Sequence, residues 1–288
     1  MNYSALIQNR KSVRSFTNKP VFFGDLEKIR DYYNNSVHRL FPEVRTELHI
    51  FGADARAALE GAAGYSRVLL GAPQYLVRLA DRHDHAHINA GFIMEDLNLK
   101  LTEMELSTCW LTFANSEDIK KALSIESRMD VVAIAAFGYG IKTTKRLRLN
   151  IRSMSDVDIV AERQYMEPKR SIYDMVFMET WGNIYKLDDH IGFFDEMLWE
   201  SLYAATLAPS YLNRQAYGFV IHQGGLSLVS RPDRYNVPTD RDLSLGIVLH
   251  HFTCVAEKWA GKLIWRFGKF NGDLGLPEGH EVIATCGL

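Results

Sequence analysis

Hydrophobic positions recur along the first half of the chain with two different spacings. Asp25–Tyr33 places apolar residues three and four positions apart, which predicts an amphipathic helix. Glu47–Phe51 alternates polar and apolar residues up to Gly52, which is typical of a strand. The same two patterns predict helices at Asp54–Gly61 and Glu117–Leu123 and strands at Gln74–Leu79 and Val131–Phe137. The last of these is almost entirely apolar, which indicates a central strand buried on both faces.

Asn89–Leu106 is the strongest predicted helix of this half. Its apolar residues form a broad surface that Glu95, Asp96 and other charged residues interrupt. A helix with so wide an apolar surface is expected to be buried over much of its circumference. Ser116 is the expected N-cap of the helix that follows.

The second half repeats this alternation of helices and strands. Helical spacing predicts helices at Asp195–Thr206 and Leu243–Leu263. Tyr217–Ile221 and Leu226–Val229 are expected to pair as a hairpin across Gly224 and Gly225, and Glu281–Cys286 is the last predicted strand.

The chain becomes polar between the two halves. Lys142–Arg152 contains five Lys and Arg residues, and Ile141–Pro168 is expected to be a long surface connection. Within it, Asp156–Arg163 is predicted to form a short helix. We therefore expect a first half over residues 1–150, a connection over residues 151–168 and a second half over residues 169–288.

The two halves also resemble each other in sequence. Leu70–Leu76 is similar to Leu207–Leu212, since both contain an Ala-Pro pair followed by Tyr-Leu. Gly91 precedes Trp110 by 19 residues, and the same 19 residues separate Gly246 from Trp265. Each Gly–Trp pair brackets a long apolar helix, so we predict a diverged internal duplication. Chance similarity is the alternative, because each match is weak by itself.

Composition narrows the class of protein. The 288 residues are 47% hydrophobic and 24% charged, with a net charge of −2, so a nucleic-acid binder with a large basic excess is not expected. The longest apolar run is shorter than the ~20 residues of a membrane span, and Met1–Ile7 has no signal-peptide pattern. Cys109, Cys254 and Cys286 are far apart, which favours free thiols and a cytoplasmic location.

The most concentrated candidate chemistry lies in Arg10–Arg14, which holds three cations and a hydroxyl. Arg supplies forked donors that match phosphate oxygens, and Lys adds a point charge. In an extended segment Arg10, Ser12 and Arg14 share a face and can point at one anion. The alternative is a solvated basic N-terminus without a ligand.

A second candidate segment is Ala208–Gln215, between a predicted helix and a predicted strand. Ser210, Asn213 and Gln215 offer the donors and acceptors that a planar heterocycle requires. The same residue types also form ordinary turns, which is the alternative explanation.

Four segments, in this order along the chain, resemble motifs of the FMN-dependent nitroreductase family. Arg10–Phe16 is similar to its N-terminal phosphate-binding motif. Asn89–Trp110, with the end Leu106-Ser-Thr-Cys-Trp-Leu111, resembles its central dimer helix. Pro168-Lys169-Arg170 resembles its Pro-Lys-x-Arg element, and Ala208–Gln215 resembles its Ala-Pro-Ser-x-x-Asn-x-Gln-Pro-Trp segment. The order fits best the subgroup in which two nitroreductase-like halves are fused in one chain.

The resemblance implies an α+β fold of nitroreductase type, with central, mainly antiparallel sheets flanked by helices and two pseudo-symmetric halves. It implies FMN as cofactor and NAD(P)H as transient reductant, with hydride passing to flavin N5 and electrons passing on to a small aromatic or quinone-like acceptor. Because the flavin carries this chemistry, no catalytic side chain and no metal are expected. The expected partner is this small-molecule acceptor, with no nucleic acid and no membrane, and the single-chain pseudo-dimer either stays monomeric or forms a homodimer.

The resemblance also assigns the cofactor contacts. The residues implied to hold the FMN phosphate are Arg10, Lys11, Ser12 and Arg14, helped by Lys169 and Arg170. The residues implied to lie beside the isoalloxazine or ribityl chain are Pro209, Ser210, Tyr211, Asn213 and Gln215. Leu111 and Thr112 would approach the other edge of the flavin through backbone groups. The phosphate set at Arg10–Arg14 and the loop at Pro209–Gln215 are about 200 residues apart, so the expectation requires the two halves to fold onto each other.

Some positions depart from the family pattern. Ala216-Tyr217 stands where the family has Pro-Trp, and Met104-Glu105-Leu106 lacks the glycines that precede Cys-Trp. Tyr65 and Arg67 lie only near the place of a family Asn and Lys. These departures support the alternative of a non-catalytic flavin-binding or ligand-free scaffold with the same fold.

Other reactive side chains are better explained by structure. His83, His85 and His87 have a spacing that suits a metal, but they lie in a polar loop where His is common. One residue of His250-His251 is expected in the core, and Cys109 is expected to be a small buried hydrophobe. The sequence has no P-loop, no G-x-G-x-x-G and no nucleophile elbow, so nicotinamide would visit the flavin face.

Overall fold

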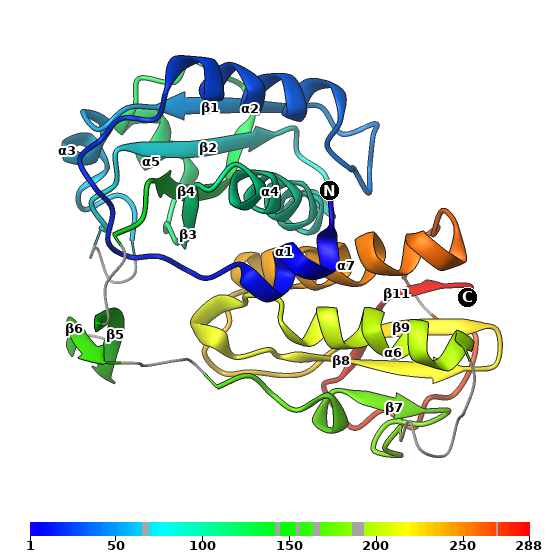
Figure 1. The fold of residues 1–288 in the computed structure, drawn as a ribbon. Helices are drawn as coiled ribbons and strands as arrows, with labels where there is room; N and C mark the ends of the chain where they lie inside the picture. The colour runs from blue at the N-terminus through cyan, green and yellow to red at the C-terminus, as the bar shows by residue number, and fades with distance from the viewer. Residues whose placement is uncertain (65–68, 142–144, 154–155, 164–167, 186–192, 269) are drawn as a thin grey trace. The chain divides into compact units, whose positions relative to one another are not determined.

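The computed structural model describes residues 1–64, 69–141, 145–153, 156–163, 168–185, 193–268 and 270–288 (Figure 1). Contacts divide the chain into two compact units. The first consists of Met1 and Asn9–Glu167, and the second consists of Asn2–Gln8 together with Pro168–Leu288. Each unit has its own sheet and its own helices.

A four-stranded antiparallel sheet forms the centre of the first unit, in the order β1-β2-β4-β3. Its strands are β1 (Thr46–Phe51), β2 (Gln74–Ala80), β3 (Ser107–Leu111) and β4 (Asp130–Gly138). All of β2 and eight of the nine residues of β4 are buried, which shows that both faces of the sheet are covered. The predicted strands at Glu47–Phe51, Gln74–Leu79 and Val131–Phe137, the last of them a central strand, are confirmed.

Two pairs of helices cover the two faces of this sheet. On one face, α4 (Ala86–Glu103) packs on β2, β3 and β4, and α2 (Phe23–Asn35) packs on α4 and β1 (Figure 1). On the other face, the short helices α3 (Ala55–Leu59) and α5 (Ser116–Ala122) close a core that contains Tyr75, Val77 and Ile134. Helix α4 is buried over nearly its whole length, as its wide apolar surface predicts.

The second unit has a five-stranded sheet in the order β10-β11-β9-β8-β7. Its strands are β7 (Val176–Met178), β8 (Tyr217–His222), β9 (Gly225–Ser230), β10 (Arg266–Phe267) and β11 (Glu281–Cys286). Strand β7 is parallel to β8, and the other neighbours are antiparallel. The predicted hairpin is confirmed, with His222 opposite Gly225 at its turn. Mainly antiparallel sheets flanked by helices are therefore confirmed for both units.

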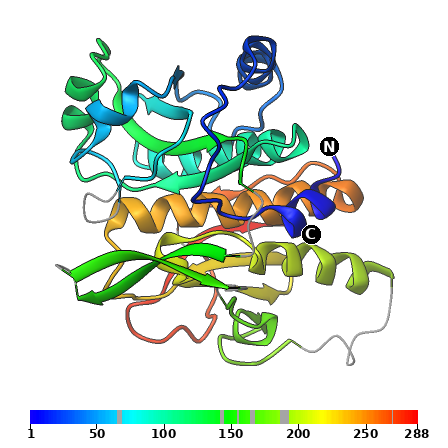
Figure 2. The same ribbon diagram turned by 60° about the vertical axis from the view of Figure 1, so that its left-hand side comes forward.

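Three helices accompany the sheet of the second unit. Helix α6 (Phe193–Thr206) packs against α7 (Pro238–Ala260), as Figures 1 and 2 show. The N-terminal helix α1 (Tyr3–Asn9) also contacts α7. The ring of Tyr3 lies 5.8 Å from that of His250, and Lys258 Nζ lies 3.3 Å from Ser4 Oγ.

The two units share one succession of elements. The first runs α2-β1-β2-α4-β3-β4 and the second runs α6-β8-β9-α7-β10-β11, apart from short insertions. When these four strands of each unit are numbered in chain order, they lie side by side in the sheet in the order 1-2-4-3. The two matched tryptophans play similar parts, because Trp110 and Trp265 each donate an indole N–H to the long helix of their own unit. The acceptors are Glu95 Oε2 and Thr253 Oγ1, each at 2.9 Å.

Two local predictions are wrong. Asp156–Arg163 is not a helix but strand β6, which pairs with β5 (Lys145–Ser153) in a twisted two-stranded ribbon (Figure 2). Strand β5 alternates apolar with polar residues, which is the two-residue period of a strand, and β6 pairs with it along its length. Ser116 does not cap α5. Asn115 does so by accepting the N–H of Glu117, while Ser116 Oγ accepts the N–H of Val131 at 2.7 Å.

Within the described ranges, no helix combines the length and the apolar character that crossing a bilayer requires.

Replacing Ile134 by Ala should destabilise the first unit by about 2–5 kcal/mol, because the residue is fully buried at the centre of β4 and the change leaves a cavity. Urea unfolding followed by circular dichroism measures this. Ile141→Ala is the matched control, since Ile141 is 48% exposed, and it should shift the free energy of unfolding by less than about 0.5 kcal/mol. Equal losses in the free energy of unfolding for Ile134→Ala and Ile141→Ala would contradict the buried position of β4.

Candidate functional site

The basic segment Arg10–Arg14 lies extended beside β3 in the first unit. Ser12 forms a parallel bridge with Thr108, and the N–H of Val13 donates to the carbonyl oxygen of Thr108 at 2.9 Å. The side chain of Val13 packs against the core beneath α3 and α5. These contacts fix the backbone of the segment, so it is not a solvated tail.

Arg10 has the most unusual environment in this segment. Its side chain is only 6% exposed, and Nε lies 3.3 Å from Oε1 of Glu95, which is fully buried in α4. The other oxygen of Glu95 accepts hydrogen bonds from Trp110 Nε1 at 2.9 Å and Asn98 Nδ2 at 3.1 Å. Sequence analysis missed this role of Glu95. The available signal was a carboxylate in a helix with a broad apolar surface, since a carboxylate buried there requires a partner inside the protein.

The donors that remain fit an oxygen-rich anion. Nη1 of Arg10 is buried and has no hydrogen-bond acceptor among the residues that the structure describes. Lys11 is exposed, and Ser12 and Arg14 are half-buried. Burial raises the pKa of the Cys109 thiol, and the charges of Arg14 and Arg10 oppose this rise. A phosphate group suits such a set of donors.

Leu111 and Thr112 stand at the end of β3. The Leu111 side chain is buried in the core, and the carbonyl oxygen of Thr112 accepts the N–H of Gly64 at 2.7 Å. That carbonyl is therefore already paired within the protein. Tyr65 and Arg67 lie outside the described residues.

In the second unit, Lys169 connects the two predicted segments. Its ammonium donates to the carbonyl oxygen of Ala208 at 2.9 Å and to Oδ1 of Asn213 at 2.8 Å. The amide of Asn213 donates in return to the carbonyl oxygen of Pro168 at 2.7 Å. The structure thus brings the Pro168–Arg170 element and the Ala208–Gln215 loop together.

Gln215 also links the Pro168–Arg170 element to the loop, through a buried side chain. Its side chain is fully buried, Oε1 accepts the N–H of Arg170 at 2.8 Å, and Nε2 donates to the carbonyl oxygen of Thr206 at 2.6 Å. Its own N–H donates to Ser210 Oγ at 2.9 Å. Both ends of the Gln215 amide are therefore used within the loop.

The loop has an unusual backbone. Leu212, Asn213 and Gln215 have φ angles of 47°, 55° and 44°, in the left-handed region that non-glycine residues seldom adopt. Ser244 of α7, which sequence analysis did not identify, accepts the N–H of Tyr211 at 3.0 Å. The side chains of Pro209, Ser210 and Tyr211 are left half-buried.

The histidines that were considered as metal ligands have aromatic or backbone contacts. Phe41 lies 5.3 Å from the ring of His83 and 5.2 Å from that of His85. In α7, His251 is fully buried and its Nδ1 lies 3.1 Å from the carbonyl oxygen of Ala204. These contacts agree with a structural role.

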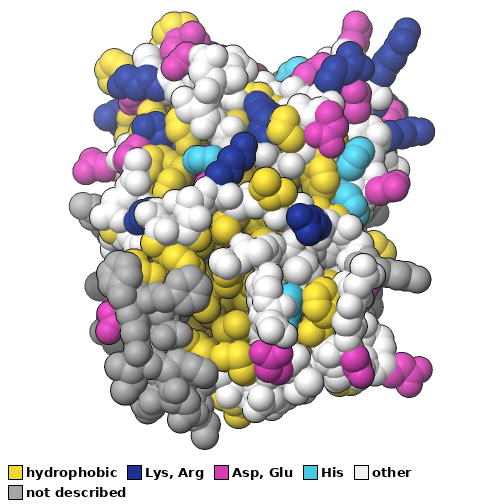
Figure 3. Space-filling model, turned by 90° about the vertical axis from the view of Figure 1, so that its right-hand side faces the viewer, with side chains coloured by type: hydrophobic (Ala, Val, Ile, Leu, Met, Phe, Trp, Pro, Cys, Tyr) yellow, Lys and Arg dark blue, Asp and Glu magenta, His cyan; other side chains and the backbone are white. Residues whose placement is uncertain are grey.

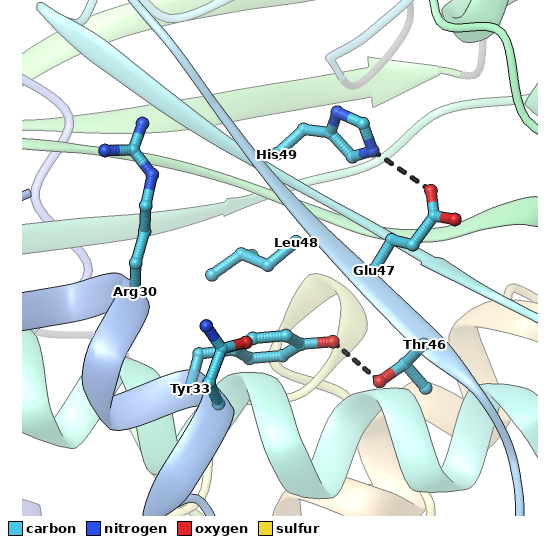
Figure 4. A pocket seen from close by; sticks show the side chains of 7 residues that line it. Arg30, Tyr33, Thr46, Glu47, Leu48 and His49 are labelled. Carbon is cyan, nitrogen blue, oxygen red and sulfur yellow. Dashed lines mark hydrogen bonds and ion pairs between the residues drawn. The ribbon is translucent and has the colours of Figure 1, made fainter. Parts of the chain in front are cut away.

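A shallow pocket of about 380 Å³ lies elsewhere in the first unit, between α2 and β1 (Figure 4). Its lining includes Arg30, Leu48 and two bonded pairs, Tyr33 with Thr46 at 2.6 Å and His49 with Glu47 at 3.2 Å. It contains none of the residues assigned to the cofactor. The face drawn in Figure 3 mixes Lys and Arg with Asp and Glu, without a broad patch of one sign.

Comparison with known proteins agrees with this geometry. The family model described as "Putative TM nitroreductase" matches residues 2–179, which is more than half of the chain. A putative nitroreductase from Thermotoga maritima MSB8 is 20% identical, with a TM-score of 0.58 over 99% of this chain and 93% of that one, and shows the same fold.

Two other solved structures align with about half of the chain. An FMN-dependent nitroreductase from Clostridium difficile R20291 is 20% identical, with a TM-score of 0.43 over 49% of this chain and 89% of that one. A putative NADH oxidase from Clostridium acetobutylicum is 18% identical, with a TM-score of 0.41 over 48% and 89%. Comparison with curated proteins finds no match. The fold of the chain, its fixed basic segment and the match of the family model together place it in the nitroreductase family that this model describes.

Proposed function

We propose that the chain binds FMN and acts as an NAD(P)H-dependent oxidoreductase of nitroreductase type. The observation that carries the proposal is the basic segment beside β3, where the Arg10 side chain is buried and its Nη1 has no acceptor among the described residues. Membership of the family supports the same activity. Bound FMN would supply the redox chemistry, accepting hydride from NAD(P)H at N5 and passing electrons to a small aromatic or quinone-like acceptor.

In the first unit, the proposal assigns the FMN phosphate to Arg10, Lys11, Ser12 and Arg14. Fixing this segment by the Ser12–Thr108 bridge lowers the entropy lost when the anion binds. Leu111 and Thr112 are proposed to face the flavin through backbone groups at the end of β3.

In the second unit, we propose that some residues contact the flavin and that others hold the Ala208–Gln215 loop in place. Pro209, Ser210 and Tyr211 are half-buried and are proposed to contact the flavin. Lys169, Asn213 and Gln215 have polar groups that bond within the unit, so we propose that they act by holding this loop. Arg170, whose side chain is exposed, is proposed to contribute charge toward the phosphate.

We also propose that the chain arose by internal duplication and carries two nitroreductase-like halves. The shared order of helices and strands and the matched Trp110 and Trp265 hydrogen bonds support this. Light scattering would distinguish a monomeric pseudo-dimer from a homodimer of whole chains.

Purified protein mixed with FMN should retain a yellow chromophore after gel filtration. Under nitrogen, NADH or NADPH should bleach its absorption band, and a quinone or nitroaromatic compound should restore it. Colourless protein that takes up no added FMN would refute the proposal. Bound FMN that neither nicotinamide reduces would favour the non-catalytic scaffold.

Arg14→Ala should weaken FMN binding roughly tenfold or more, because a charge-assisted hydrogen bond contributes about 1.5–3 kcal/mol. Quenching of flavin fluorescence measures the dissociation constant. Lys28→Ala removes an equal charge from α2, where the side chain is 69% exposed, and should leave binding unchanged. Weaker FMN binding in Arg14→Ala but not in Lys28→Ala would support the assignment. An unchanged dissociation constant in Arg14→Ala would show that Arg14 does not belong to the phosphate site.

Lys169→Met should lower the free energy of unfolding of the second unit by about 1.5–3 kcal/mol, since Ala208 and Asn213 lose a charged donor. Urea unfolding measures the loss, and flavin titration of the folded variant measures its effect on binding. Lys262→Met is the matched control, because Lys262 is exposed. A variant as stable as the control would show that Lys169 does not hold the loop.

A further inference from the structure

The carboxylate of Glu95 is buried in the middle of α4. Its side chain has no exposed surface, and the neighbouring Asp96 and Asn98 of the same helix are fully buried as well. Three groups approach its two oxygens from different segments: Arg10 Nε at 3.3 Å, Trp110 Nε1 at 2.9 Å and Asn98 Nδ2 at 3.1 Å. Each oxygen therefore has a partner inside the protein, as a buried carboxylate requires.

This arrangement fixes the direction of the Arg10 side chain. Asn98 is on the same helix as Glu95 and Trp110 is on β3, so both hold the carboxylate against the rigid part of the unit. The carboxylate forms an ion pair with the Nε side of the guanidinium, and Nε makes no hydrogen bond among the described residues. Nη1, on another corner of the same planar group, is buried and has no acceptor among the described residues. Arg10 is thus held at one edge with a donor left over.

A buried ion pair is weak evidence for stability by itself, because well-packed apolar residues of similar volume often serve as well. An orienting role explains why charged groups stand here. A guanidinium that is already held in place loses less freedom when it binds an anion than a mobile one does.

We infer that Glu95 is a positioning residue, which orients Arg10 so that its free donor meets the phosphate of a flavin mononucleotide. This rests on the proposed function, and it adds to that function a residue outside the predicted contact set. Because Glu95 acts through Arg10, its effect is confined to ligands that carry the phosphate. Riboflavin has the same ring system and ribityl chain without the phosphate, so it is the reference ligand.

The test compares dissociation constants for FMN and riboflavin, measured by fluorescence quenching on the full chain. Wild type should bind FMN more tightly than riboflavin. Glu95→Gln should narrow this preference roughly fivefold to tenfold, with riboflavin affinity unchanged, since one charge-assisted contact is misdirected. Glu103→Gln is the matched control, because Glu103 lies on the same helix, 37% exposed and paired with Lys100, and its preference should equal that of wild type.

Two further variants separate positioning from structural support. With Arg10→Ala already present, Glu95→Gln should have no further effect on the FMN-to-riboflavin ratio, because Glu95 acts through Arg10. If Glu95→Gln does not fold, Trp110→Phe removes one of the bonds to the carboxylate and should narrow the preference about twofold to threefold.

An unchanged ratio in folded Glu95→Gln, or in Trp110→Phe where that variant replaces it, would overturn the inference, as would equal weakening of both flavins. Either result leaves the proposed function standing if wild type still prefers FMN. Wild type that binds neither flavin, or that shows no preference for FMN, would overturn the phosphate assignment and the inference together.

Discussion

The long helices α4 and α7 are buried over most of their length, and the polar architecture of each unit depends on this constraint. Helix α4 carries Glu95 and Asp96 with no exposed surface, and α7 carries His251 in the same condition. A polar group removed from water must find its partner inside the protein. Asp96 therefore accepts from Tyr32 Oη at 3.0 Å and from the N–H of His38 at 2.9 Å, which ties α2 and the following loop to the helix.

The same requirement links the basic N-terminal segment to the core of the first unit. Without a cation nearby, the Glu95 carboxylate would be too costly to bury. Arg10 neutralises it and is drawn out of water, down to 6% exposure. Arg10 belongs by composition to a polar segment, but its side chain thereby becomes part of the packed interior of the first unit. Nη1 of Arg10 lies in this region without an acceptor among the described residues.

In the second unit, the same need to pair buried polar groups determines the conformation of the Ala208–Gln215 loop. Gln215 satisfies the N–H of Arg170 and the carbonyl oxygen of Thr206, and Lys169 satisfies the carbonyl oxygen of Ala208. These bonds hold three non-glycine residues at positive φ, a conformation that costs free energy and persists only when its surroundings fix it. The resemblance to a cofactor-binding motif pointed to this segment, and several of the polar side chains of the segment bond within the second unit.

The sequence by itself determined the helices and strands wherever one periodicity was clear, and it marked Arg10–Arg14 and Ala208–Gln215 as the segments with candidate chemistry. It failed where two periods competed, as in β6, and where strands were very short, as in β7 and β10. Tertiary structure alone decided the partners: Asn115 instead of Ser116 as the cap, Glu95 as the partner of Arg10, and α1 against α7. The reason is physical. Local spacing sets which face a side chain occupies, but the partner of a buried charge or amide is set by which distant segment closes over that face.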